Sequence, residues 1–229
     1  MKRTALQSLL SLAVAGAIAA FVFVLFAQTR QRSDTFAAQV AAGAQKLFAS
    51  GQRKEAIGAL EELLATNRES IIARRELAME LLDDGQWQAA ADQLRLVLKA
   101  VPTDAGAAAK LAEALDKLGD LQAATDYAHR ACRLDPENGL RWITLSALLF
   151  RAGDADGALR AGKRAVRYAA GVPDAHLALG FAQWLSGDTA AAAKSLSDAL
   201  ALDPSNPTAQ DALARLRAYP HRPPPSPPS

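Results

Sequence analysis

The chain of 229 residues is half hydrophobic but only 6% aromatic, so its apolar residues are mainly alanine and leucine, which favour helices over strands. A formal net charge of +2 excludes a strong overall attraction to nucleic acid or anionic membranes. The single cysteine, Cys132, excludes an internal disulfide and a cysteine-based metal cluster. We therefore expect an all-α fold, arranged as one or two ordinary domains or as one elongated repeat array.

The N-terminal segment predicts a membrane anchor. A short basic N-terminus, residues 1–8, precedes residues 9–27, a stretch of 19 residues without charge. As a helix this stretch rises about 28 Å, close to the hydrocarbon thickness of a bilayer. A cleaved secretory signal is the alternative, but its apolar region would be shorter, roughly 7 to 15 residues, and Leu25 is poorly placed before a cleavage site at Ala27. We expect an uncleaved signal anchor that places residues 9–27 in the lipid bilayer.

The flanking charges of this anchor do not decide its orientation. Lys2 and Arg3 precede the apolar stretch, and Arg30 and Arg32 follow it, so the positive charges on its two sides nearly balance. A short N-terminus usually stays in the cytoplasm, which would place the rest of the chain on the periplasmic side. The alanine-rich and arginine-rich composition suggests a GC-rich bacterium. The expected location is therefore a bacterial inner membrane, crossed once, with residues 28–36 as a linker.

Glycine and alanine recur with a period of 34 residues between residues 37 and 206. Each glycine is followed five residues later by an alanine. The pairs are Gly51 and Ala56, Gly85 and Ala90, Gly119 and Ala124, Gly153 and Ala158, and Gly187 and Ala192. They divide the region into units 37–70, 71–104, 105–138, 139–172 and 173–206 without insertion or deletion.

The chemistry of one unit accounts for this spacing. The glycine ends a first helix because it tolerates a left-handed backbone, and an aspartate after it, such as Asp120 or Asp188, can cap a second helix. The alanine is expected where the two antiparallel helices come closest. Small residues also recur seven places before each glycine: Ala44, Ala78, Ala112, Ser146 and Gly180. Three units end at a proline, which stops the second helix: Pro102, Pro136 and Pro204.

This pattern resembles the tetratricopeptide repeat (TPR), a helix–turn–helix unit of 34 residues that stacks into a right-handed superhelical solenoid. The first unit departs from the family pattern at Gly43 and Arg68, and the fourth reads "YAAGVP" where others end in "LDP". Residues 207–218 resemble the solvating helix that caps the last repeat. The proline-rich residues 219–229 are expected to form a disordered, extended tail, in which Pro220 and Pro223 have P-x-x-P spacing.

The resemblance implies that the first helix of each unit lines a concave groove. Large apolar residues fall at its inward positions, so we expect a peptide groove formed by Phe48, Met79, Leu82, Ile143, Phe150, Leu177, Phe181 and Trp184. Exposed apolar patches usually mark interaction surfaces. In the alternative, packing between units or the terminal helix covers these side chains. The carboxylate clamp that holds chaperone tails in part of the family is disfavoured, because Ala41 and Gln45 stand at its first positions.

A basic convex patch is expected on the second helices of units three and four. It comprises Arg130, Arg133, Arg160, Lys163, Arg164 and Arg167, with His129 beside them. Anionic lipid or nucleic acid could bind there through phosphate contacts. The alternative is an ordinary solvated face, because residues 37–206 carry 19 lysines and arginines against 22 aspartates and glutamates. Nucleic acid is therefore disfavoured as a partner.

No arrangement of residues in the sequence predicts catalysis. His129, His176 and His221 lie in different units or in the tail and lack a paired ligand spacing, and Cys132 occupies an apolar position where we expect it to be buried. We therefore expect a protein that is not an enzyme and takes no cofactor or metal. The leading interpretation is a membrane-anchored TPR scaffold with a protein or peptide partner. The alternatives are a self-associating structural protein, a homo-oligomer without a dedicated peptide partner, and a soluble secreted adaptor if the N-terminal segment is cleaved.

Overall fold

The computed structural model describes residues 2–218, except for the side chains of residues 2–22 and 25–26. Within this range it is all-α and contains no strand, as the composition predicts. Its helices are α1 (Lys2–Ala49), α2 (Arg53–Thr66), α3 (Ile71–Asp83), α4 (Trp87–Ala100), α5 (Ala105–Lys117), α6 (Leu121–Leu134), α7 (Gly139–Arg151), α8 (Ala155–Tyr168), α9 (Pro173–Leu185), α10 (Thr189–Leu202) and α11 (Pro207–Ala218). The helices form two compact units, Met1–Glu80 and Leu81–Ser229.

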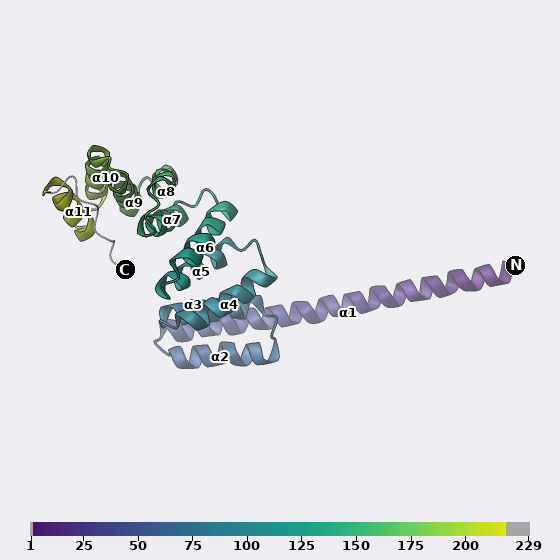
Figure 1. Cartoon of the computed structure of the whole chain (residues 1–229). Coiled ribbons are helices and arrows are strands. Elements are labelled where there is room, and N and C mark those ends of the chain that lie inside the picture. Colours follow the sequence, from purple (N-terminus) through teal and green to yellow (C-terminus); the bar gives the residue numbers. More distant parts are fainter. Residues whose placement is uncertain (1, 219–229) are drawn as a thin grey trace. The chain divides into compact units, whose positions relative to one another are not determined.

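The first unit is dominated by α1, a single helix of 48 residues (Figure 1). Residues 28–36, expected as a linker, are helical and continuous with it; they contain no glycine or proline that would end a helix. The C-terminal part of α1 packs against α2 through a face that includes Ala37, Ala41 and Ala44, all buried. A hydrogen bond of 2.7 Å from Asn67 Nδ2 to Ser33 Oγ ties the end of α2 to α1.

The expected membrane anchor falls mostly outside the side chains that the structure describes. The structure does not describe the side chains of residues 9–22 and 25–26. Among the described residues, no helix combines the length and the apolar character that a membrane crossing requires. The proline-rich tail, residues 219–229, likewise lies outside the described residues.

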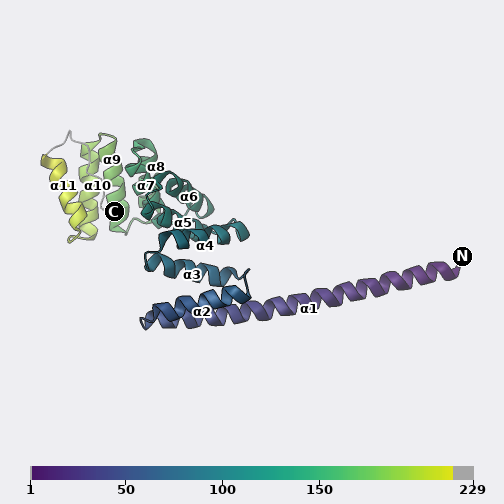
Figure 2. The same cartoon turned by 60° about the horizontal axis from the view of Figure 1, so that its bottom comes forward.

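The second unit is a stack of helices in which each packs against the next along the chain. Helices α5 and α6, α7 and α8, and α9 and α10 pair within repeats, while α6 with α7 and α8 with α9 join neighbouring repeats. Figure 2 shows α9, α10 and α11 lying side by side. Helix α11 covers α10 with a face formed by Ala209, Ala212, Leu213 and Leu216, all buried. The last repeat therefore does not end in an uncovered apolar face at this point.

The recurring glycines and alanines adopt the geometry that the spacing predicts. The glycines at the turns have positive φ angles of 82°, 75°, 82°, 77° and 86° in chain order, which confirms the left-handed turn at each reversal. The alanines five residues later are each 0% exposed. In the fourth repeat, Ser146 Oγ on α7 donates a hydrogen bond of 2.9 Å to the carbonyl oxygen of Ala158 on α8. A larger residue at Ala158 would separate these two helices.

Helix capping distinguishes the later repeats from the earlier ones. The carboxylates of Asp120, Asp154 and Asp188 each accept a hydrogen bond from a backbone N–H in the first turn of the following helix, at 3.1, 2.8 and 3.0 Å. This confirms the predicted caps in the last three repeats. Gln52 and Gln86 stand at the equivalent places in the first two repeats and make no such bond.

Cys132 on α6 is 1% exposed, as expected for a packing residue. Burial raises the pKa of its thiol to about 12. The side chain therefore behaves as a small hydrophobic group.

Candidate functional site

The apolar residues predicted to line a groove are divided between the two units. Phe48 and Met79 belong to the first unit and are half-buried. Leu82 belongs to the second unit and is only 3% exposed. The remaining five residues come from α7 and α9, which pack together in the second unit.

Four of these residues line one pocket. Ile143 and Phe150 from α7 face Leu177 and Phe181 from α9 around a volume of about 210 Å³. Ser146 and Ala147, Asp174 and Ala178, and Thr208 at the start of α11 complete the lining. We call this the α7–α9 pocket. It combines an apolar wall with one carboxylate and two hydroxyl groups.

The aromatic residues of this cluster are buried rather than exposed. Phe150 and Phe181 are each 7% exposed and Trp184 is 4% exposed. The ring centroids of Phe150 and Phe181 lie 5.4 Å apart, and Trp184 stacks on Phe181 with centroids 6.5 Å apart, so the three rings pack as one cluster. The expectation that these three side chains face solvent is therefore wrong, and packing between the neighbouring repeats that contain α7 and α9 contributes to their burial. Ile143 and Leu177, both half-buried, form the more accessible wall.

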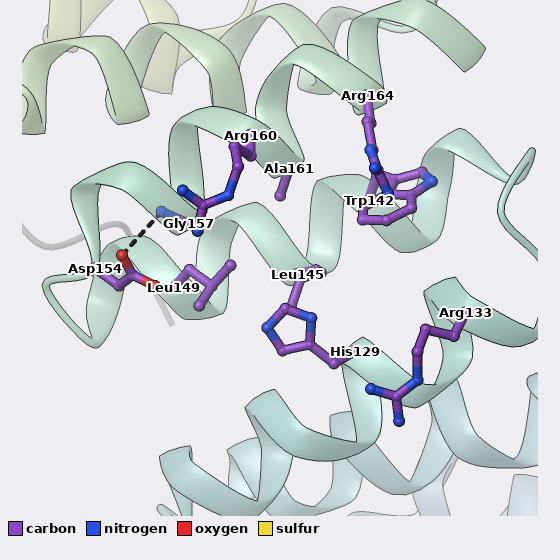
Figure 3. Close-up of a pocket in the computed structure, with 10 residues that line it drawn as sticks. All are labelled: His129, Arg133, Trp142, Leu145, Leu149, Asp154, Gly157, Arg160, Ala161 and Arg164. Atoms are coloured by element: carbon purple, nitrogen blue, oxygen red, sulfur yellow. Dashed lines mark hydrogen bonds between the residues drawn. The ribbon is translucent and has the colours of Figure 1, made fainter.

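A second pocket lies among α6, α7 and α8 (Figure 3). Its volume is about 220 Å³. Its floor is formed by Trp142, Leu145 and Leu149 of α7 and by Ala161 of α8, all at most 7% exposed. We call this the α6–α8 pocket.

The rim of the α6–α8 pocket is cationic. Arg133 on α6 and Arg160 and Arg164 on α8 line it, and all three are exposed. The guanidinium group of Arg164 stacks over the Trp142 ring, 4.5 Å from its centre, as Figure 3 shows. Trp142 Nε1 donates a hydrogen bond of 2.8 Å to the carbonyl oxygen of Pro136, which fixes the indole. The one carboxylate in the lining, Asp154, accepts the capping bond from Gly157.

Burial and the surrounding charges of this pocket shift the pKa of His129 on α6. Desolvation lowers the pKa of its imidazole below the usual value, and the positive charge of Arg133 lowers it further. Arg160 acts in the same direction from α8, while Asp126 and Asp154 act in the opposite direction. His129 is therefore a neutral group near pH 7, set between two walls that both carry arginines.

The other residues of the predicted basic patch lie outside the α6–α8 pocket. Arg130 donates a hydrogen bond of 2.6 Å to the carbonyl oxygen of Pro102. Lys163 is exposed, and the Arg167 guanidinium lies 5.8 Å from the centre of the Tyr168 ring. The structure thus gathers three of the six predicted cations around one hollow.

Sequence reasoning found the cations around this hollow but missed the aromatic residue in its floor. Trp142 was not singled out, although the equivalent positions of the other repeats carry Val40, Arg74, Ala108 and His176. The available signal was a large aromatic residue at this position in the repeat whose second helix carries Arg160 and Arg164. For chemistry of another kind, no group of three histidine, cysteine, aspartate or glutamate residues that could bind a metal ion occurs among the described residues.

Two family models together match most of the repeat region. Both describe the tetratricopeptide repeat; one matches residues 41–104 and 75–139, and the other matches residues 149–216. The chain belongs to the tetratricopeptide repeat family. Proteins of this fold are generally interaction scaffolds rather than enzymes. A comparison with curated proteins finds no match.

Solved TPR structures share the fold. MamA is 23% identical with a TM-score of 0.67, over 70% of this chain and 94% of MamA. YrrB, described as a TPR protein with an unusual peptide-binding site, is 19% identical with a TM-score of 0.67, over 76% of this chain and 89% of YrrB. A thermophilic TPR protein of Thermus thermophilus, TTC0263, is 20% identical with a TM-score of 0.58, over 80% of this chain and 99% of that protein. At these identities the similarity establishes the fold alone.

Proposed function

We propose that this TPR protein is a membrane-anchored scaffold that grips an apolar helix or extended peptide of a partner protein at the α7–α9 pocket. The observation that carries the proposal is the half-buried wall of Ile143 and Leu177 beside the buried rings of the same pocket. A preformed apolar pocket with a few polar groups at its edge suits one or two apolar side chains of a peptide. Asp174 and Thr208 supply groups that can accept or donate hydrogen bonds to the peptide backbone.

The comparisons support the general part of this proposal. TPR proteins are interaction scaffolds, and YrrB is described as having a peptide-binding site. The preformed geometry also lowers the cost of binding, because buried rings do not lose rotamer freedom when a peptide arrives.

The proposed anchor is residues 9–27, and the proposed location is a bacterial inner membrane with the repeats on the periplasmic side. The support is the length of the uncharged stretch and its position within the single helix α1. Protease treatment of spheroplasts tests the orientation, because only periplasmic repeats would be digested. N-terminal sequencing of the mature protein separates an anchored protein from a secreted adaptor, since cleavage would remove the stretch.

The binding proposal is tested by capture from solubilised membranes with matched variants. In one variant Ile143 and Leu177 are both replaced by alanine, which removes the accessible wall of the pocket. In the control, Leu140 is replaced by alanine; it also lies on α7, is 61% exposed and does not line the pocket. Quantitative mass spectrometry should show a partner retained by the wild type and the Leu140→Ala control but reduced at least tenfold with the double variant.

Phe181 and Trp184 are less suitable for this test. Both are buried, so their replacement by alanine would create a cavity that costs about 3–5 kcal/mol of stability for each ring. Thermal unfolding of the Ile143/Leu177 variant controls for folding. Equal capture by all three proteins would contradict the proposal, and concentration-dependent oligomerisation with no captured partner would favour the self-associating alternative.

A further inference from the structure

We propose that the α6–α8 pocket is a second protein-docking site, which accepts an acidic segment of a partner by inserting one apolar side chain between flanking carboxylates. This site shares no lining residue with the α7–α9 pocket and does not depend on the function proposed for it. The proposal rests on the charge of the rim, the apolar floor and the size of the hollow.

The rim cations form no ion pair among the side chains that the structure describes. No pair joins Arg133, Arg160 or Arg164 to a carboxylate there, although exposed arginines elsewhere, such as Arg95 and Arg215, pair with aspartates on their own helices. Two of these guanidinium groups extend from α8 and one from α6, on opposite sides of the hollow (Figure 3). Like charges that face one another across a gap are complementary to an anion placed between them. Guanidinium groups bind carboxylates through paired hydrogen bonds.

The apolar floor of the pocket favours a ligand that also carries an apolar group. Trp142, Leu145 and Leu149 are buried, yet part of each side chain lines the hollow. The Trp142 ring is stacked with Arg164 and bonded through its nitrogen, so it presents a fixed surface. A simple inorganic anion would leave the small exposed part of this floor in contact with water. A ligand that covers it needs an apolar group next to its negative charges.

The size of the pocket favours an anchoring side chain over a whole small molecule. Its volume of about 220 Å³ lies below the ~300–1,000 Å³ typical of sites that enclose complete ligands. Its arginines are exposed, and exposed ion pairs taken singly are weak. A segment of a larger partner gains from several such pairs at once, and Lys163 and Arg167 extend the positive surface along α8.

Charge on the rest of the repeats argues against a long polyanion. Residues 37–206 carry more acidic than basic side chains, 22 against 19, so a nucleic acid that extended beyond the patch would be repelled. A short acidic segment confined to the patch avoids that repulsion. Anionic lipid and nucleic acid are therefore the competing outcomes of the test.

The test measures fluorescence anisotropy of the peptide Asp-Glu-Leu-Glu-Asp, amidated at its C-terminus and labelled with an uncharged dye, titrated with the full chain in detergent. Two comparison peptides separate the two requirements: Asn-Gln-Leu-Gln-Asn lacks the charges, and Asp-Glu-Gly-Glu-Asp lacks the apolar group. We expect each to bind at least fivefold more weakly than the parent peptide. Raising the salt from 50 to 500 mM should weaken the parent peptide and leave the uncharged one unaffected.

Matched variants on one helix locate the site. Arg160→Gln with Arg164→Gln removes one wall of the rim, and Lys163→Gln with Arg167→Gln removes the same charge from α8 outside the pocket. We expect the first pair to weaken binding at least tenfold and the second pair to weaken it less than threefold. Arg133→Gln on α6 should also weaken binding, and because it lies on the facing helix it checks that a loss is not a defect of α8. Circular dichroism melting should be alike for all of these variants.

Defined results would overturn the proposal. Equal losses for the two pairs on α8 would mean general charge attraction without a pocket. Equal binding of the glycine and leucine peptides would mean that the floor is not used. Tighter binding to phosphatidylglycerol vesicles or to a 20-residue oligothymidine than to the peptide, lost in the Arg160/Arg164 variant, would assign the site to lipid or nucleic acid instead. Absence of peptide binding at millimolar concentration would also refute it.

Discussion

Replacing Gly153 by alanine tests whether the turns between paired helices need a left-handed backbone. Gly153 has a φ of +77°, and a Cβ atom added there would have no heavy atom within 4 Å. The substitution therefore creates no clash, and its cost comes from the backbone alone. The left-handed conformation destabilises the folded protein by about 1–2 kcal/mol when the residue is alanine. Alanine also lowers the conformational entropy of the unfolded chain, which offsets about 0.4–1 kcal/mol of that loss. We expect a net loss of about 1 kcal/mol in the free energy of unfolding.

Gly171 provides the matched control. It also has no heavy atom within 4 Å of an added Cβ, but its φ lies outside the left-handed region. Alanine there should stabilise the protein by about 0.4–1 kcal/mol through the unfolded state. The two variants should therefore differ by about 1.5 kcal/mol, although the same methyl group is added in the same compact unit.

The assay is urea unfolding followed by circular dichroism at 222 nm, with a thermal melt as a second measure. The Gly153→Ala variant should unfold at lower urea than the wild type, and Gly171→Ala at equal or higher urea. Gly153→Asn should lose less than Gly153→Ala, because asparagine tolerates the left-handed region better than alanine. Identical midpoints for the two alanine variants would refute the argument that backbone conformation selects glycine at the turn.

Three further predictions follow from packing, burial and capping. Gly162→Ala should lower the free energy of unfolding by about 1–3 kcal/mol, because the added Cβ would lie 3.0 Å from Leu179 Cα. The control Gly58→Ala in α2, whose Cβ would have no heavy atom within 4 Å, should raise the free energy of unfolding by about 0.5–1 kcal/mol in urea. A stabilising Gly162→Ala would contradict the close approach. Iodoacetamide at pH 8 should alkylate Cys132 about 1,000-fold more slowly in the folded protein than in urea, because raising the thiol pKa from 9.0 to about 12 lowers the fraction of reactive thiolate. Equal alkylation rates, measured by mass spectrometry, would show that the thiol is not buried. Gln86→Asp should add about 0.5–1 kcal/mol by supplying the cap that α4 lacks, and an unchanged thermal melt would show that this helix end needs none.

The repeat geometry could be predicted from the sequence because every unit must solve the same local problem. A chain that reverses between two close helices needs a residue that tolerates positive φ and, five residues later, one with almost no side chain. Gly119 and Ala124 meet these needs within one stretch of sequence. In the structure Gly119 has a φ of +82°, and Ala124 is fully buried. Residues a few places apart in the sequence meet local requirements of this kind. Because the same residues recur in each repeat, the periodicity of the sequence predicts the turn and the close helix contact.

The exposure of the apolar residues could not be predicted in the same way. Phe181 occupies a position that the family resemblance places on the concave face, yet its ring is covered by Phe150 from the preceding repeat and by Trp184. Burial at such a position depends on how large the neighbours are in the adjacent repeat. The helical state of residues 28–36, by contrast, could have been predicted, because their sequence contains no glycine or proline that would end the preceding helix.

Helix α7 gives the two pockets their separate characters. Its residues Ile143, Ala147 and Phe150 recur at helical spacing on one face, which lines the α7–α9 pocket. Its residues Trp142 and Leu145 lie on a different face, which forms the floor of the α6–α8 pocket. Because adjacent residues on a helix are rotated by about 100°, neighbours such as 142 and 143 serve different pockets. One rigid helix can therefore position an apolar site and a cationic site independently, and substitutions confined to one face should change one binding activity while leaving the other intact.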